Sequence, residues 1–114
     1  MTEVMLRKFR FKRDKKQEWM DWCRELTRRQ DEVLETLRNE GVLMEACFLA
    51  PDEESVYYFL EVEDFEKALK AYDASPYPLD EEHRRHKGAS MEEVAKLRCL
   101  FYFKNVPGSG GRVS

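Results

Sequence analysis

The densest group of chemically active side chains surrounds the two histidines, His83 and His86, which stand three residues apart with Glu82 beside them. Residues three apart on a helix lie close to one face, so two imidazoles and a carboxylate could together bind a metal ion. Two arginines stand between the histidines and a lysine follows them, and these positive charges disfavour a bound dication. The sequence therefore favours a charged helix surface and predicts no metal site and no cofactor.

The three cysteines, Cys23, Cys47 and Cys99, are too widely spaced for a C-x-x-C pair, and their number is odd. This pattern indicates reduced thiols rather than a disulfide framework. A reactive thiol needs a nearby base or cation, and Cys47 is the candidate because charged residues share its predicted face of the sheet. We expect the other two to be small buried hydrophobes.

The composition describes one small domain with an ionised surface. The chain has 114 residues, of which 42% are hydrophobic and 38% are charged. Twenty basic and 23 acidic residues give a net charge of −3, which argues against a nucleic-acid binder. No apolar run approaches the ~20 residues of a membrane span. The N-terminus lacks the apolar stretch of a signal peptide, so we expect a cytoplasmic protein without a membrane partner.

Hydrophobic periodicity divides the first half of the chain into a strand, a helix and two strands. Alternating residues predict a strand over 4–12. Apolar residues at helical spacing predict one long helix that begins at Lys16 and ends at Gly41. Two runs rich in aromatic and branched residues, 42–50 and 55–62, predict antiparallel strands joined by a turn.

The second half of the chain contains more interruptions. Asp64 can cap a second helix, and the prolines after residue 75 end it. We expect a short helical turn over 80–87, a capping box over 90–93 that opens another turn, and a last strand over 97–104. The glycine-rich residues 106–114 predict a flexible tail.

This order of elements predicts a ferredoxin-like α+β domain over residues 4–105. In such a βαββαβ arrangement both helices cover one face of a four-stranded antiparallel sheet. Two right-handed crossovers would place the first and third strands at the centre of the sheet.

Strand alternation then assigns the side chains to two faces of the sheet. We expect the helices to cover the face with Val4, Leu6, Val42, Met44, Ala46, Phe48, Val56, Tyr58, Leu60, Val62, Leu97, Cys99, Phe101 and Phe103. The other face would expose about ten large apolar or sulfur-containing residues, more than soluble monomers tolerate, so we expect a homodimer through it. Its four charges would form ion pairs or line a small-molecule cleft. The predicted ligand-binding residues are Arg7, Phe9, Glu45, Cys47, Tyr57, Phe59, Glu61, Arg98 and Tyr102.

Three segments give the chain a resemblance to the dimeric α/β-barrel superfamily. They are the helix with Glu18-Trp-Met-Asp-Trp22, the strand ending Tyr57-Tyr-Phe-Leu-Glu61 and the segment Leu79-Asp-Glu-Glu-His-Arg84. Within this superfamily the chain is similar to a family of small, uncharacterised bacterial proteins over residues 4–105. The superfamily includes cofactor-free monooxygenases, haem-binding enzymes, mutarotases and isomerases, so the resemblance does not identify a reaction.

The resemblance implies a role for His83, because superfamily members place their ligand beside the segment that precedes the last strand. An imidazole with a pKa near 6.5 suits general acid–base work if it points inward, and Glu45 or Glu61 could orient it. Three functions follow. The first is a homodimer that binds a small molecule or is purely structural. The second is a cofactor-independent monooxygenase- or isomerase-like enzyme that uses His83, Arg7 and a glutamate. The third is a protein-interaction or regulatory module that uses the charged helix faces.

Overall fold

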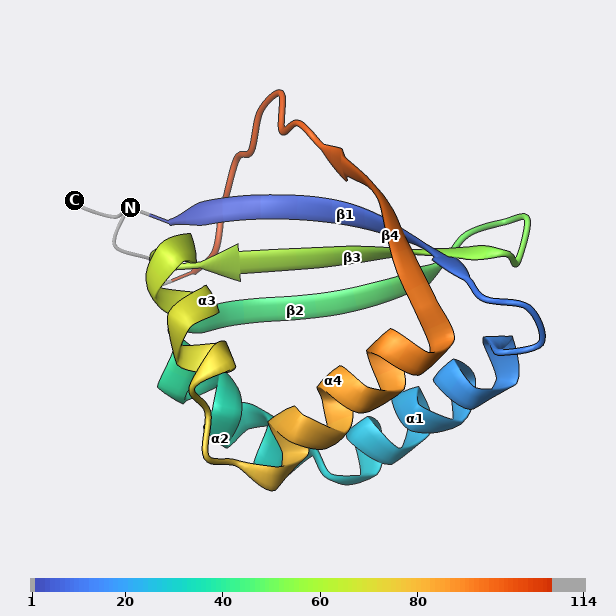
Figure 1. The fold of residues 1–114 in the computed structure, drawn as a ribbon. Helices are drawn as coiled ribbons and strands as arrows, with labels where there is room; N and C mark the ends of the chain where they lie inside the picture. The colour runs from blue at the N-terminus through green and yellow to red at the C-terminus, as the bar shows by residue number, and fades with distance from the viewer. Residues whose placement is uncertain (1, 108–114) are drawn as a thin grey trace.

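The computed structural model describes residues 2–107, which form an α+β domain with a four-stranded antiparallel sheet and four helices. Along the chain the elements are β1 (Glu3–Phe11), α1 (Lys16–Arg28), α2 (Gln30–Glu40), β2 (Val42–Leu49), β3 (Ser55–Val62), α3 (Phe65–Asp73), α4 (Pro78–Ser90) and β4 (Met91–Leu97). The strands lie in the order β2–β3–β1–β4, and all four helices lie on one side of the sheet (Figure 1). Most of the predicted tail, residues 108–114, lies outside the described part of the chain.

Local sequence explains where several elements begin and end. The Asp64 side chain accepts a hydrogen bond from the backbone N–H of Lys67 and so caps α3, as the sequence predicts. Gly41 ends α2 in a left-handed conformation with φ 71°, which glycine adopts without steric cost. Pro78 occupies the first turn of α4, where its missing N–H needs no partner. None of the helices within residues 2–107 is long and apolar enough to cross a membrane.

The predicted long helix is two helices, because its backbone leaves the helical conformation at Arg29. There φ is −103° and ψ is 36°, and the Arg29 N–H is shared between the carbonyls of Glu25 and Leu26. The interruption lets the two halves take partly different neighbours: both pack against α4, but α2 also packs against α3 and β2. Hydrophobic periodicity does not reveal it, since the apolar positions keep their spacing through the break.

The prediction for the end of the chain is wrong in two respects. The predicted turn over 80–87 is part of the 13-residue helix α4, and the predicted capping box over 90–93 is the last residue of α4 and the first three of β4. The last strand therefore spans Met91–Leu97 rather than 97–104. Pairing with the central strand β1 fixes β4 in place, with Met91 opposite Phe11 and Leu97 opposite Leu6. This tertiary pairing overrides the helical propensity of Glu92 and Glu93.

The predicted faces of the sheet are correct for β3 but inverted for β1 and for most of β2. Residues directly opposite each other in an antiparallel pair share a face. Arg7 and Cys47 are both opposite Tyr58, and Tyr58 packs in the core beneath the helices. The whole set Met5, Arg7, Phe9 and Phe11 therefore faces the helices, and so do Glu45, Cys47 and Leu49. A register irregularity between Val42 and Met44 reverses the phase of β2 after its first residue.

The hydrophobic core is concentrated toward one end of the sandwich. Its buried residues are Phe9, Trp19, Trp22, Val56, Tyr58, Leu79 and Met91. Trp19 is 1% exposed and lies between α1 and the sheet, with its ring centroid 6.4 Å from that of Tyr58. Toward the other end of β3, Leu60 is only partly buried, and the exposed Leu34 and Leu69 belong to the helices there. The large core side chains therefore gather at one end of the sandwich, whereas at the other end Val62 and Ala68 are buried beside these more exposed leucines.

The two described glycines provide a matched test of this backbone. A Cβ at Gly41 would meet Oε1 of Glu63 at 3.1 Å and would have to adopt positive φ, so we expect Gly41→Ala to destabilise the fold by about 1–2 kcal/mol. Gly88 lies within α4 with nothing within 4 Å of an added Cβ, so Gly88→Ala should stabilise it by about 0.5–1 kcal/mol. Urea unfolding measures the change in the free energy of unfolding for both variants. Changes of the same sign would contradict the left-handed conformation at Gly41 or the helical one at Gly88.

Candidate functional site

A cavity of about 650 Å³ separates the helices from the helix-facing side of the sheet. This volume is typical of a site for a small molecule. One part of the wall is apolar and is formed by Leu26, Val33, Leu34, Leu37, Val42, Leu60, Val62, Phe65, Ala68 and Leu69. The chemically active part is formed by Arg7, Cys23, Glu40, Glu45, Cys47, Tyr58, Tyr72, Asp80, His83 and Lys87. The cavity thus combines an apolar surface with converging polar groups.

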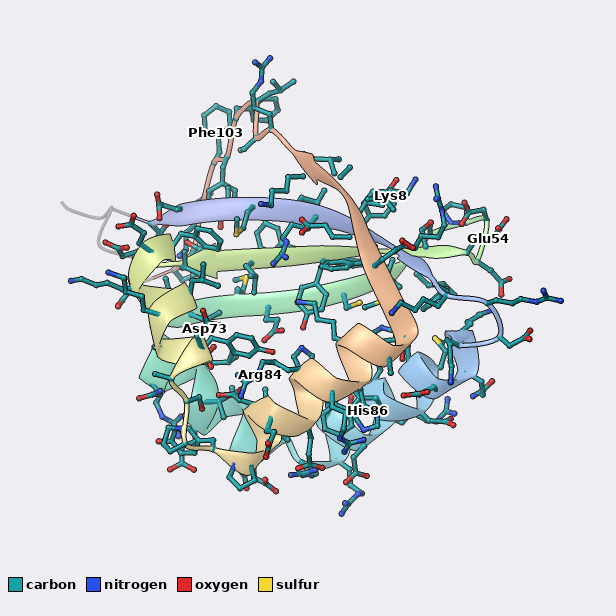
Figure 2. All side chains as sticks on the ribbon, in the orientation of Figure 1. Lys8, Glu54, Asp73, Arg84, His86 and Phe103 are labelled. Carbon is teal, nitrogen blue, oxygen red and sulfur yellow. The ribbon has the colours of Figure 1, made fainter. Side chains whose placement is uncertain are left out.

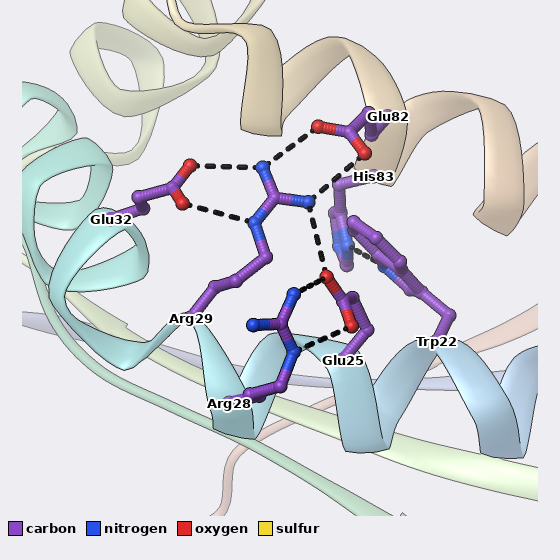
Figure 3. A network of polar contacts seen from close by, with 7 residues as sticks. All are labelled: Trp22, Glu25, Arg28, Arg29, Glu32, Glu82 and His83. Atoms are coloured by element: carbon purple, nitrogen blue, oxygen red, sulfur yellow. Dashed lines mark hydrogen bonds and ion pairs between the residues drawn. The ribbon is translucent and has the colours of Figure 1, made fainter.

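A chain of hydrogen bonds leads from the helices to the sheet within this cavity. Trp22 Nε1 is 2.9 Å from His83 Nδ1, as Figure 3 shows, and His83 Nε2 is 3.0 Å from the hydroxyl of Tyr58. The Tyr58 hydroxyl in turn donates to a carboxylate oxygen of Glu45. Because an indole N–H can only donate, His83 Nδ1 must be the acceptor and its proton must be on Nε2. Every donor in the chain therefore points toward Glu45.

Burial determines the charges along this chain. Burial, assisted by the positive charge of Lys87, lowers the pKa of His83 to about 3, so its imidazole is neutral. Burial also raises the pKa of Glu45, and the hydrogen bond from Tyr58 opposes that rise. The pKa of Tyr58 is raised well above 10 by burial and by the nearby Glu45 carboxylate. Glu45 is therefore the basic group of the chain.

Lys87 places a cation beside this base. Its Nζ lies 5.0 Å from the ring centroid of Tyr58 and 4.8 Å from that of Phe9. Burial and the charge of Arg7 lower the pKa of Lys87 to about 8, whereas Glu45 acts in the opposite direction. Arg7 is held by Glu93 through two hydrogen bonds of 2.9 and 3.1 Å. Within residues 2–107, Lys87 is thus the cation of this wall that forms no salt bridge.

Two cysteines also line the cavity. Cys23 comes from α1 and Cys47 from β2, on the helix-facing side of the strand. The neighbouring Cys47 thiol and burial raise the pKa of Cys23, and the Cys23 thiol lowers that of Cys47. Cys47 is exposed although it faces the helices, because its surface borders the cavity. Cys99, which the sequence predicts to be buried, is exposed.

The structure divides the predicted ligand-binding residues between the two sides of the sheet. Arg7, Glu45, Cys47 and His83 meet in the cavity, and Phe9 is buried in the core beside it. Tyr57, Phe59 and Glu61 lie on the side without helices, because they alternate with Tyr58 and Leu60 along β3. Tyr102 is on that side as well, and Arg98 follows the end of β4 as an exposed residue.

On the helix-free side, the segment after β4 covers Glu61. Glu61 is fully buried, and its carboxylate accepts hydrogen bonds from Thr2 Oγ1, the Tyr102 hydroxyl and Lys104 Nζ at 2.8, 3.0 and 3.0 Å. The ion pair with Lys104 lowers the pKa of Glu61. With all its contacts satisfied, this carboxylate anchors the last described segment to β3 and is not available to orient His83.

The three residues considered for a metal site face different partners. Glu82 forms a bidentate ion pair with Arg29, with N–O distances of 2.8 and 3.0 Å. Arg29 also binds Glu32 (Figure 3). His86 stacks on the Trp22 indole with ring centroids 4.3 Å apart, while His83 lies in the cavity. Within residues 2–107, no group of three or more His, Cys, Asp or Glu side chains is arranged to hold a metal ion.

The sequence does not identify several residues that line the cavity, namely Glu40, Tyr58, Tyr72, Asp80 and Lys87, nor Trp22, which binds His83 from outside the cavity wall. A signal for some of them exists. Once α4 is extended back to Pro78, Asp80, His83 and Lys87 recur at positions i, i+3 and i+7 and share one helix face. Tyr58 is predicted on the helix-facing side of the sheet and Trp22 on the apolar face of the first helix, but their polar atoms become informative only when His83 lies between them.

The fold and the cavity define a small α+β domain with a potential ligand site between its helices and its sheet. By comparison with known families, the chain belongs to the family described as "Family of unknown function (DUF6176)", whose model matches residues 2–106. No curated protein and no solved structure matches the chain.

The burial of a neutral His83 predicts how stability depends on pH. Between its folded pKa of about 3 and an unfolded pKa near 6.5, the unfolded chain binds a proton that the folded chain does not, so stability falls as the pH is lowered. Between pH 7 and pH 5, the free energy of unfolding measured with urea should fall by about 2 kcal/mol more in the wild type than in His83→Asn. Equal losses, or an imidazole that titrates near pH 6.5 by NMR, would show that His83 is not held in this way.

Proposed function

We propose that this protein binds a small, largely apolar molecule in the cavity and transfers a proton on it, with Glu45 as the general base. The observation that carries the proposal is the hydrogen-bonded chain from Trp22 through His83 and Tyr58, which ends on a Glu45 carboxylate facing the cavity. A base of this kind needs a raised pKa and a fixed orientation. Burial raises the pKa of Glu45, and the hydrogen bond from the Tyr58 hydroxyl fixes the orientation of its carboxylate.

The reaction type that fits best is an isomerisation by proton transfer. A proton from a substrate C–H bond passes to the Glu45 carboxylate, and the electron pair of that bond moves onto an adjacent substrate carbonyl. The ammonium of Lys87 stabilises the resulting oxyanion. Return of the proton to a different atom completes the reaction, so the cycle consumes no oxidant or reductant.

In this proposal His83 is a positioning residue rather than the acid or base expected from the sequence. With a pKa of about 3 and both ring nitrogens engaged, it neither gains nor loses a proton near neutral pH. It orients the Tyr58 hydroxyl toward Glu45 instead. The wider cavity wall is apolar, which supports a substrate with a hydrocarbon body.

Deuterium exchange tests the proton transfer directly. Molecules from a library of small carbonyl metabolites that raise the melting temperature are incubated with the protein in D2O, and mass spectrometry follows deuterium incorporation. We expect incorporation that Glu45→Gln reduces by at least ~100-fold while binding persists. Tyr58→Phe should reduce deuterium incorporation less than Glu45→Gln does. In the wild type, the rate of incorporation should decrease above about pH 8, where Lys87 loses its proton.

The matched control is Glu35→Gln, the same change at an exposed position of α2. It should leave both binding and exchange unchanged. Binding with no exchange for any hit would contradict the catalytic part of the proposal and would leave a binding protein. Exchange that survives Glu45→Gln would assign the base to another residue.

We further propose that the sheet has the ferredoxin-like βαββαβ topology and that two copies pair through the side without helices, as in a dimeric α/β barrel. The strand order β2–β3–β1–β4 and the placement of all helices on one side support the topology. A row of apolar side chains crosses the other side: Ala46, Phe59, Leu6 and Leu97 are successive cross-strand neighbours. Phe48 beside them is 60% exposed.

The segment after β4 extends this apolar surface. Phe101 and Phe103 stack with ring centroids 5.2 Å apart and are 74% and 84% exposed. Figure 2 shows Phe103 on the far side of the sheet from the helices. Aromatic rings this exposed favour association, because a second copy would remove them from water.

Sedimentation equilibrium at micromolar concentration tests the pairing. The wild type should behave as a dimer, and Phe48→Glu should weaken association by at least ~100-fold because it buries an unpaired charge. Asn39→Glu, which adds the same charge on an exposed position of α2, should have no effect. A wild-type monomer at these concentrations would contradict the proposal without affecting the cavity.

A further inference from the structure

We propose that the molecule bound in the cavity carries an ammonium group, and that Glu40, Asp80 and Tyr72 bind it. The proposal rests on the proposed function, since it assumes that the cavity holds a ligand, and it specifies the chemical class of that ligand. The expected class is a primary amine with an apolar body.

The observation that carries this inference is a group of buried polar atoms that receive no hydrogen bond from any residue outside the group. Within residues 2–107, Glu40 Oε2, Asp80 Oδ2 and the Tyr72 hydroxyl are shielded from solvent, and the two carboxyl groups have only each other as hydrogen-bond partners. All three residues line the cavity, and Asp80 is only 4% exposed. Burying such atoms without partners destabilises a fold, so three of them on one cavity wall indicate that a ligand supplies the partners.

The three side chains come from separate, well-defined elements. Glu40 is the last residue of α2, Tyr72 lies near the end of α3, and Asp80 lies in the first turn of α4. Negative charge is favoured at the N-terminus of α4 by the helix dipole. A site assembled from three helices holds its ligands in fixed positions, which is what recognition of a compact charged group requires.

The positive charge of Arg84 lowers the pKa values of Glu40 and Tyr72, but its guanidinium binds neither carboxyl group of the described cluster. Arg84 donates to the backbone carbonyl of Tyr72 at 2.7 Å, and its guanidinium lies 4.9 Å from the Tyr72 ring centroid. No salt bridge joins it to Glu40 or Asp80 within the described residues. An ammonium group would bring one positive charge and three donors to two carboxyl groups and one hydroxyl.

The balance of charge around the cavity supports a cation. Burial, followed by the hydrogen bond and the charge of the neighbouring Asp80 carboxyl, raises the pKa of Glu40 to about 8; Glu45 on β2 adds to the rise, and Arg84 opposes it. Three carboxyl groups from α2, α4 and β2 therefore face one another across the cavity, with Lys87 beside Glu45 alone. The apolar residues Leu60, Val62 and Leu69 line the rest of the wall and would contact a hydrocarbon body.

The experiment compares three probes of equal chain length that differ only in the end group: hexylamine, hexanol and hexanoate. Isothermal titration calorimetry at pH 8 should show that hexylamine binds at least ~10-fold more tightly than hexanol and that hexanoate binds least, because hydrogen bonds to charged groups are the stronger ones. Asp80→Asn and Glu40→Gln should remove this preference for the amine and retain the binding of hexanol.

Tyr72→Phe is the second variant, since it deletes one hydroxyl and leaves both carboxyl groups in place should Asp80→Asn fail to fold. It should lower the affinity for hexylamine by about 3- to 10-fold. Glu35→Gln on the exposed face of α2 should change nothing. Equal binding of the three probes would overturn the inference and leave the ligand cavity intact, whereas no binding of any of them would overturn both proposals.

Discussion

The hydrogen bonds that join Trp22, His83 and Tyr58 hold the helix layer at a fixed distance from the sheet. Each of these residues is less than a tenth exposed, and each belongs to a different element: α1, α4 and β3. Since Trp22 can only donate, the protonation of His83 is set by packing and not by solvent. A change in any member of this chain would leave a buried donor or acceptor unpaired, so the separation of the two layers and the existence of the cavity depend on it.

Several carboxyl groups are kept in this cavity at a cost in stability. Glu40 and Glu45 have raised pKa values because burial penalises their charged forms, and within residues 2–107 the Asp80 carboxyl has no hydrogen-bond partner except the Glu40 carboxyl. An apolar wall at these positions would stabilise the domain more. Local conflicts of this kind are concentrated at functional sites in proteins. Their position beside the aromatic chain, rather than on the charged outer helix faces, is the strongest physical argument for a site there.

The sequence predicts the α+β class, the positions of β1, β2, β3 and α3, and the left-handed end of α2 at Gly41, because each depends on local periodicity or capping. It does not predict which side of β1 faces the helices. In β1 both alternating sets contain apolar residues, Val4 and Leu6 on one side and Met5, Phe9 and Phe11 on the other, so pairing with β3 decides the phase. In β2 the irregularity after Val42 reverses the phase within one strand.

These reversals account for the divided outcome at the candidate site. Arg7, Glu45 and Cys47 meet in the cavity because β1 and β2 turn these positions toward the helices, where His83 of α4 joins them. The residues predicted from β3 fall on the other side, since its phase is the expected one. Tyr58 could not be recognised from its type alone, because a tyrosine at a core position is usually structural. Its role emerges only when His83 and Glu45 lie on either side of its hydroxyl.

The two sides of the sheet are mechanically connected through β3. Tyr58 projects into the cavity, whereas its neighbours Tyr57 and Phe59 project from the other side, and Glu61 two residues further on is fixed by Tyr102 and Lys104. A rigid central strand transmits a displacement on one side to the other, since protein interiors are close-packed. Pairing of two copies on the helix-free side would therefore restrain β3, and with it the position of the Tyr58 hydroxyl against Glu45. Glu45 and Phe48 both lie on β2, so any effect of dimerisation on proton transfer would travel through β2 as well as through β3.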